Sequence, residues 1–151
     1  MKNKSIILSL LFIVLINCGY QPIYVAKKNN FKIESIEIIK KDRLNSLIKN
    51  ELKNISNKES INKIDLIIDS SKEIIISSKD TKGNAEILTM TVLVNLKIIE
   101  EKKIKAEKVF TKKFSYSNNS NKFSLNQYQK DIEKNLRDKI IENIVTYLLT
   151  K

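Results

Sequence analysis

Hydrophobic residues recur at every second position over three long stretches between residues 64 and 116. The clearest stretch is residues 88–98, where apolar side chains occupy every even position and polar ones all the odd positions except Leu93. Such alternation is typical of a strand with one buried face. Residues 64–76 and 104–116 show a similar pattern, and turn-rich segments at 79–84 and 100–103 separate the three. The pattern predicts an antiparallel meander of three long strands.

Each predicted strand has an apolar face and a more polar one. The residues expected to face the core are Ile64, Leu66, Ile68, Ile74, Ile76, Leu88, Met90, Val92, Val94, Leu96, Ile98, Ile104, Ala106, Phe110, Phe114 and Tyr116. The opposite face carries Asp65, Asp69, Glu73, Ser77, Thr89, Thr91, Asn95 and Lys97. We therefore expect one face of the sheet to be covered and the other to be wettable.

Two further segments have the period of a helix. Residues 43–55 carry apolar side chains at three-and-four spacing, and Asp42 is a suitable N-cap. A second helix is expected to begin near Ser124, which forms a capping box with Gln127. Its apolar stripe, over about 26 residues, consists of Leu125, Tyr128, Ile132, Leu136, Ile140, Ile144 and Leu148.

A short strand over residues 31–39, with an irregularity near Ser35, completes the pattern. The order of elements is then β-α-β-β-β-α. The economical arrangement is an α+β fold in which two helices pack on one face of a four-stranded, mostly antiparallel sheet. Residues 31–151 are expected to form this single α+β domain.

The N-terminal residues predict export and lipidation. Lys2 and Lys4 precede an apolar run of 11 residues, 6–16, which is shorter than the roughly 20 needed to span a membrane. The only cysteine of the chain, Cys18, follows one residue later, after Asn17. The layout resembles a bacterial lipobox and predicts a cleaved signal peptide at 1–17, a diacylglyceryl and acyl (palmitate-type) anchor on Cys18, and an extended lipidated leader at 18–30. An ordinary cleaved signal or an uncleaved anchor is the alternative interpretation.

The net positive charge of the chain indicates which class of binding partner to expect. Removal of Lys2 and Lys4 lowers the formal net charge from +11 to +9, so the mature chain stays basic. An exported, membrane-anchored protein meets anionic glycolipids and phosphorylated lipids. A soluble nucleic-acid-binding domain is a less favoured alternative, because the export signal argues against it and the strands lack an aromatic-interleaved basic face. We expect no nucleic-acid partner.

The chain lacks most of the residue types on which enzyme catalysis usually depends. There is no histidine, the single cysteine is assigned to the lipid, and only Gly19 and Gly83 are present, so metal sites, nucleophile–base triads and Gly-rich phosphate loops are not expected. Asp65 and Asp69 lie on the polar strand face and are interpreted as solvated charges. The sequence predicts a binding or structural protein, with no enzyme activity, no metal and no cofactor beyond the lipid on Cys18.

The leader, Cys18-Gly19-Tyr20-Gln21-Pro22-Ile23-Tyr24, resembles the Cys-Gly-Phe-x-Pro-Leu-Tyr start of the LPS-assembly lipoprotein family (LptE), alphaproteobacterial type. The resemblance extends to the pattern of strands and helices in the rest of the chain. It implies a lipoprotein of the cell outer membrane, anchored by its lipid and facing the periplasm and the lumen of a β-barrel. That barrel is the LPS-assembly protein (LptD-like), which the lipoprotein binds and plugs, assisting its assembly and the delivery of lipopolysaccharide to the cell surface. Gly19 permits sorting to the outer membrane.

The same resemblance implies a lipopolysaccharide site built from basic residues near a strand end and loop. Lys79 and Lys82 in the predicted turn fit this description, with Lys97 on the outward strand face as a weaker candidate. A different outer-membrane accessory lipoprotein, of a barrel-assembly or scaffold type, would share the anchor and the small α+β domain. The barrel that co-purifies with the chain would discriminate between the two.

Overall fold

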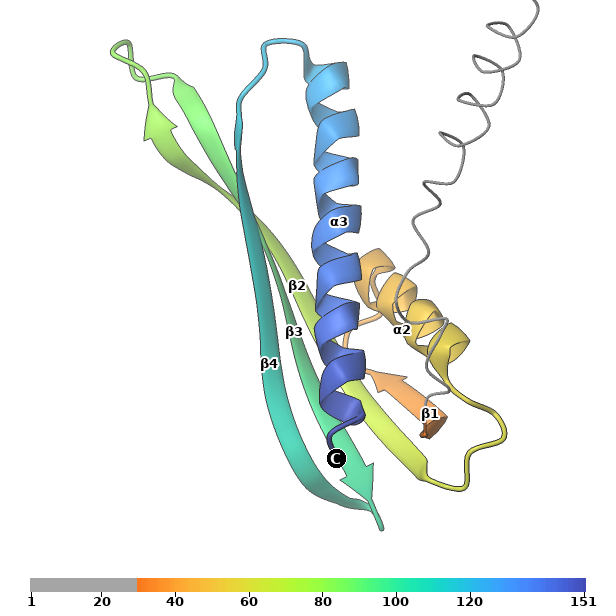
Figure 1. The fold of residues 1–151 in the computed structure, drawn as a ribbon. Coiled ribbons are helices and arrows are strands. Elements are labelled where there is room, and N and C mark those ends of the chain that lie inside the picture. The colour runs from red at the N-terminus through yellow and green to blue at the C-terminus, as the bar shows by residue number, and fades with distance from the viewer. Residues whose placement is uncertain (1–29) are drawn as a thin grey trace, which may run out of the picture.

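The fold is a four-stranded sheet with both helices on one face, as the sequence predicts (Figure 1). The structure is a computed structural model and describes residues 30–151; the expected signal peptide, Cys18 and most of the leader lie outside these residues. The elements are β1 (Lys32–Ile38), α2 (Arg43–Ile55), β2 (Lys63–Lys79), β3 (Ala85–Glu100), β4 (Lys103–Ser117) and α3 (Lys122–Leu148). Within the described part, no helix is both long and apolar enough to cross a membrane.

The strands lie in the order β1-β2-β3-β4. β1 runs parallel to β2, whereas β2 with β3 and β3 with β4 are antiparallel pairs. The register of β1 against β2 shifts between Ile33 and Ser35, which confirms the predicted irregularity. Pairing with β1 reaches only Ile68, although β2 continues to Lys79. The far half of the β2–β3 hairpin therefore extends beyond β1 and α2 (Figure 1).

The core lies between the sheet and the two helices. The stripe predicted for the last helix is buried, with Ile140 and Ile144 fully inaccessible, and only Tyr128 departs from it at 47% exposed. Leu44, Ile48 and Leu52 are the buried positions of α2 along with Asn45. The sheet contributes Leu66, Ile68, Met90, Val92, Val94, Leu96, Ile98, Phe110 and Tyr116.

The sequence predicts the N-terminal cap of α2 correctly but not that of α3. α2 begins as expected, because the Asp42 carboxylate accepts a hydrogen bond from the Asn45 amide at 2.8 Å. α3 begins near Ser124, as expected, but the predicted capping box of Ser124 and Gln127 is wrong. Asn121 is the N-cap, and its side-chain oxygen accepts from the Ser124 amide at 3.1 Å, so the helix begins at Lys122. Asn competes with Ser as a cap because its side-chain oxygen reaches the same free amides.

Four strand residues expected to face the core are exposed. Ile74 and Ile76 share the face of Leu66 but lie past the end of α2, and they are 38% and 52% exposed. Phe114, at 46%, lies on the outermost strand. Ile104 is on the wrong face: a register shift in β4 pairs it with Ile99, which lies on the uncovered side of the sheet.

Candidate binding surfaces

The face of the sheet opposite the helices is the largest candidate surface. Within residues 30–151 no element covers it (Figure 1). Besides the expected polar residues, it carries aliphatic side chains at the remaining outward positions: Ile67, Ile75, Ile87, Leu93, Ile99 and Val109. Val109 is 52% exposed and Ile75 49%. The expectation of a merely wettable face is therefore incomplete, because polar and apolar side chains are mixed across it, as they are on surfaces that contact other proteins.

Polar side chains on this face are linked across the strands. The Thr89 hydroxyl is hydrogen-bonded to Ser77 on β2 and, at 2.7 Å, to Ser115 on β4. Lys97 forms an ion pair of 3.7 Å with Glu107. The Glu107 carboxylate also accepts a hydrogen bond from the side-chain amide of Asn95 at 2.8 Å. These links fix the side chains of the face in place, so a partner would meet a preorganised surface.

The β2–β3 loop holds two of the three lysines expected to bind lipopolysaccharide. Asp80 organises this loop: its side chain accepts from the backbone amides of Lys82 and Asn84 at 2.9 and 2.8 Å, and from the Asn84 side chain at 3.0 Å. Gly83 completes the turn at φ +85°, a conformation that L side chains rarely adopt. The hydrogen bonds from the Asn84 side chain and backbone, with those from Lys82 and Gly83, hold the pKa of Asp80 below its ordinary value.

Lys79, the last residue of β2, and Lys82, in the turn that follows, lie at the same end of the hairpin, whereas Lys97 lies apart. Lys79 and Lys82 are exposed, and neither forms an ion pair with another described residue. Lys97 lies 12 positions along β3 from Ala85, the partner of Lys79. At about 3.3 Å per residue, this is roughly 40 Å from the loop. Lys97 also forms an ion pair with Glu107. Because of the separation, a single anionic head group cannot contact all three lysines.

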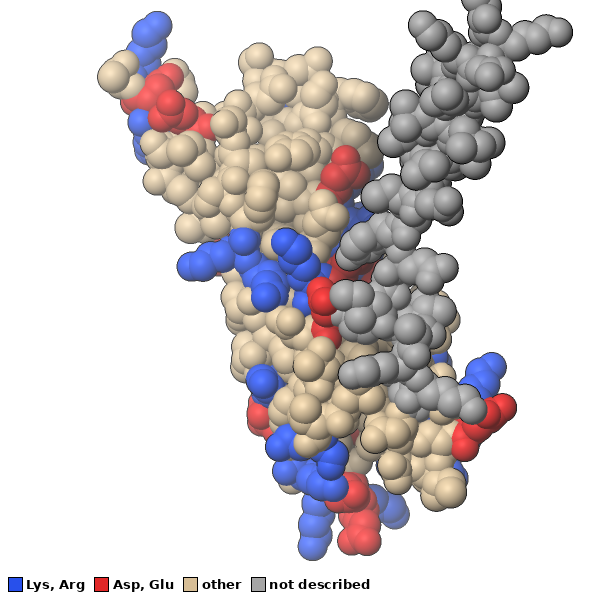
Figure 2. All heavy atoms as spheres, in the orientation of Figure 1, with Lys and Arg blue, Asp and Glu red and all other residues tan. Residues whose placement is uncertain are grey.

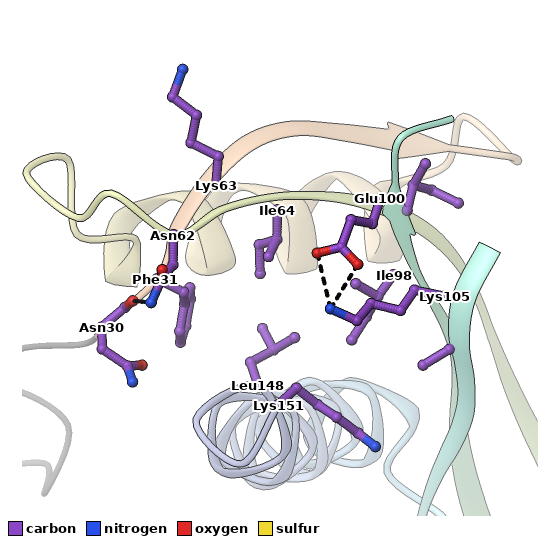
Figure 3. A pocket seen from close by; sticks show the side chains of 12 residues that line it. Asn30, Phe31, Asn62, Lys63, Ile64, Ile98, Glu100, Lys105, Leu148 and Lys151 are labelled. Carbon is purple, nitrogen blue, oxygen red and sulfur yellow. Dashed lines mark hydrogen bonds and ion pairs between the residues drawn. The ribbon is translucent and has the colours of Figure 1, made fainter. Parts of the chain in front are cut away.

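A cavity lies at the opposite end of the molecule, where α3 ends (Figure 3). Its volume is about 350 Å³, and Phe31, Ile64, Ile98 and Leu148 form its apolar part. The rim is charged: Lys105 pairs with Glu100 at 2.7 Å. The described chain begins here at Asn30, whose carbonyl accepts hydrogen bonds from Ser60 and Asn62. The residues that precede Asn30 therefore join the domain at this end.

Cations are spread over several separate groups. Figure 2 shows a band of Lys and Arg across the middle of one face, further cations at each end, and an almost uncharged area beside the start of α3. Lys108 lies over the rings of Phe110 and Tyr147, 5.4 and 4.5 Å from their centroids. In residues 30–151, no three carboxylates come together as a metal ion would require.

Two ion pairs, each with one buried partner, were not anticipated from the sequence. Arg137 Nε donates to Glu51 at 2.8 Å and joins α3 to α2, and Lys72 Nζ lies 2.6 Å from the Glu133 carboxylate and joins β2 to α3. The partners are 86 and 61 residues apart in sequence. The only signal in the sequence is that Glu133 and Arg137 follow Ile132 and Leu136 within the apolar stripe.

Comparison with known proteins places the fold in one structural class. Rare lipoprotein B from Shewanella oneidensis aligns with a TM-score of 0.58 at 13% identity, over 79% of this chain and 97% of that one. A minor lipoprotein from Acinetobacter baumannii aligns with a TM-score of 0.58 at 13% identity, over 81% and 92%. Lipoprotein B from Nitrosomonas europaea gives 0.59 at 11%, over 84% and 88%.

The chain thus has the fold of the bacterial lipoproteins of the rare lipoprotein B type. At these identities the similarity establishes the fold alone. No family model matches the chain, and no curated protein matches its sequence.

Proposed function

We propose that this chain is an outer-membrane lipoprotein, anchored through Cys18, that binds and plugs an LPS-assembly barrel of the LptD type. In this role it assists the assembly of the barrel and the delivery of lipopolysaccharide to the cell surface. The observation that carries the proposal is the broad, mixed polar and apolar face of the sheet, left uncovered on a fold shared with bacterial lipoproteins. The resemblance of residues 18–24 to the LptE leader supports it independently.

The uncovered face has the chemistry that a position inside a barrel requires. The lumen of an outer-membrane barrel is polar, so a plug needs outward side chains that form hydrogen bonds or ion pairs. On the uncovered face Lys97 pairs with Glu107 and the Thr89 hydroxyl is bonded to two neighbours. Asp69, Glu73 and Lys113 on the same face form no ion pair with a described residue, so they are free to contact polar groups of the lumen. Aliphatic residues such as Leu93 and Val109 add area that gains free energy when it is removed from water.

The β2–β3 loop is the proposed contact for lipopolysaccharide. The turn between β2 and β3 lies at one end of the molecule, and the C-terminal end of α3 lies at the other (Figure 1). Lys79, the last residue of β2, and Lys82 in the turn are both exposed. Their ammonium groups can form charge-assisted hydrogen bonds with the phosphates of the glycolipid. Asp80 holds the loop in one conformation, so these contacts cost little further ordering.

Depletion of the chain in its own cells tests the proposal. Loss of the protein should lower both the amount of correctly folded barrel and the lipopolysaccharide on the cell surface. Re-expression of the unaltered chain should restore both. Restoration should fail with a Leu93→Glu, Val109→Glu variant, which places two unpaired charges on the uncovered face.

The matched control is Asn143→Glu with Thr146→Glu, which adds the same two charges to exposed positions of α3. We expect the control to restore function at least in part, and more fully than the variant of the uncovered face. A folded barrel and surface lipopolysaccharide that stay unchanged after depletion would contradict the proposal.

A further inference from the structure

The far half of β2 has an open edge. The last hydrogen bond on this side joins the Ile39 amide to the Ile68 carbonyl, at 3.1 Å. Beyond it, no described residue pairs with β2 on the side away from β3. Backbone groups of an antiparallel strand point alternately to its two neighbours. Because the Ile68 carbonyl points to β1, the amides and carbonyls of Ser70, Lys72, Ile74 and Ile76 point away from β3, into the open edge.

The other edge of the sheet is protected, whereas this edge is not. β4 carries lysines at five of its 15 positions: Lys103, Lys105, Lys108, Lys112 and Lys113. Lysines on an edge strand oppose pairing with other chains. β2 has no lysine between Lys72 and Lys79, and presents instead Ile74, Ile75 and Ile76, which are 38%, 49% and 52% exposed. Of the two edges, the β2 edge is the one suited to receive a strand.

A cavity of about 280 Å³ lies at the start of this open edge, between β2 and the beginning of α2. Lys40, Arg43 and Lys72 line it together with Asp42 and Glu133. Both carboxylates are engaged, Asp42 with Asn45 and Glu133 with Lys72. Lys40 and Arg43 form no ion pair with any described residue, so the cavity has cationic groups to spare.

Ser70 adds an unsatisfied donor to the same cavity. Its side chain lines the cavity, the residue is only 5% exposed, and its hydroxyl has no hydrogen-bond partner among the described residues. A buried hydroxyl without a partner costs free energy that an incoming acceptor would recover. Arg43, Lys40 and Ser70 together are suited to a carboxylate.

We propose that the open edge of β2, residues 70–76, binds an extended segment of a partner protein by strand addition, with an acidic residue of that segment in the cavity beside Arg43. The backbone of the segment would pair with Ser70, Lys72, Ile74 and Ile76. Its side chains would pack beside Ile74 and Ile76 on one face and Ile75 on the other. Backbone pairing provides affinity in this binding mode, and the side-chain positions provide specificity.

Two other occupants fit less well. In a mature chain that begins at Cys18, the 12 residues before Asn30 reach at most about 40 Å. A return along β1 uses roughly 25 Å of that reach, which leaves too few residues to cover the edge. A second copy fits poorly because antiparallel self-pairing centred on Ile75 would place its Lys79 opposite Ser71, at the cavity that already holds Lys40 and Arg43.

A synthetic probe tests the proposal on the full-length protein in mild detergent. The probe is the labelled peptide Ser-Val-Thr-Val-Thr-Val-Asp-Asp, with blocked ends, followed by fluorescence anisotropy. For antiparallel addition its acidic end would lie at the cavity. We expect saturable binding that weakens at least about tenfold when alternate amides of the probe are N-methylated, because these can no longer donate.

Variants locate the binding on the protein. Ile74→Lys should weaken binding of the probe at least about tenfold, since it gives the edge the protection that β4 has. Phe114→Lys, a matched change in the same row and on the same face at the β4 edge, should leave binding unchanged. Arg43→Gln should weaken binding of the Asp-Asp probe but not of an Asn-Asn probe.

The proposal is overturned if the probe does not bind saturably up to about 1 mM, or if the N-methylated probe binds equally well. Self-association of the chain that Ile74→Lys abolishes would also overturn it, since a second copy would then be the occupant. The outcome is independent of the proposed barrel function, because the probe experiment involves neither the barrel nor lipopolysaccharide.

Discussion

Asp80 determines the conformation of the loop that presents Lys79 and Lys82. Its carboxylate accepts three hydrogen bonds, which lower its pKa from the ordinary value. A carboxyl group whose pKa is lowered on folding stabilises the structure above its ordinary pKa of about 3.9. That contribution is lost as the pH falls through the lowered pKa of the folded state.

The loop is therefore expected to keep its structure at neutral pH and to loosen only in acid. In NMR spectra, the backbone amide signals of Lys82 and Asn84 should shift with a midpoint below about pH 3.9. An Asp80→Ala variant should show altered signals at these two residues at every pH. A midpoint at or above the ordinary carboxyl pKa would contradict the role assigned to Asp80.

Arg137 is the residue that joins the two helices most directly. Its side chain is 8% exposed and pairs with Glu51 on α2. Arg137→Ala should lower the free energy of unfolding by about 2 kcal/mol, since a largely buried charged hydrogen bond is lost. Lys134→Ala, which removes an exposed ion pair with Asp138 on the same helix, should cost no more than about 0.5 kcal/mol. Urea unfolding measures both; equal effects would show that burial of the Arg137 pair is unimportant.

Among the elements, α3 contributes most to the covered side of the sheet. Ile140 is fully buried on it. Ile140→Ala should lower the free energy of unfolding by about 2–5 kcal/mol, because it removes buried methyl groups and leaves a cavity. Ile61→Ala in the loop before β2 is the control: Ile61 is 93% exposed, and the change should stay within about 0.5 kcal/mol. Similar losses for the two variants in thermal or urea unfolding would contradict the assigned core.

The periodicity of the sequence predicts all six elements and their order, and it predicts α2 to the residue. It does so because period and capping are local properties, as with Asp42 and Asn45. The N-cap of α3 is missed because Asn121 and Ser124 are both good caps, and only the folded geometry selects one. The exposure of Ile74 and Ile76 depends on where α2 ends in space, which the strand pattern does not contain.

The candidate sites were predictable to a smaller extent. The sequence places Lys79 and Lys82 in one loop because they are close in the chain. It does not reveal that Lys97 pairs with Glu107, because that contact depends on the register between β3 and β4. The open edge of β2 was also not predicted, since it results from the short reach of β1 along a much longer neighbour.

At the scale of the whole molecule, the question is whether the position of the cations or the net charge governs lipopolysaccharide binding. Under the proposed function, Lys79→Glu with Lys82→Glu should weaken lipopolysaccharide binding by about tenfold or more, because two cation–phosphate contacts become repulsive. Lys58→Glu with Lys130→Glu gives the same change in net charge at exposed positions elsewhere. This control should bind nearly as the unaltered protein does at matched ionic strength. Equal weakening in both variants would show that net charge, and not the loop, governs binding.

The proposed function requires this chain to form a complex with an outer-membrane barrel. To test this, membranes are solubilised in mild detergent, a C-terminally tagged copy of the full-length chain is captured, and the captured proteins are identified by mass spectrometry. We expect a large LPS-assembly barrel in roughly equal amount to the tagged chain. A membrane-bound chain that captures no barrel, or that captures a barrel-assembly or scaffold complex instead, would contradict the proposed function.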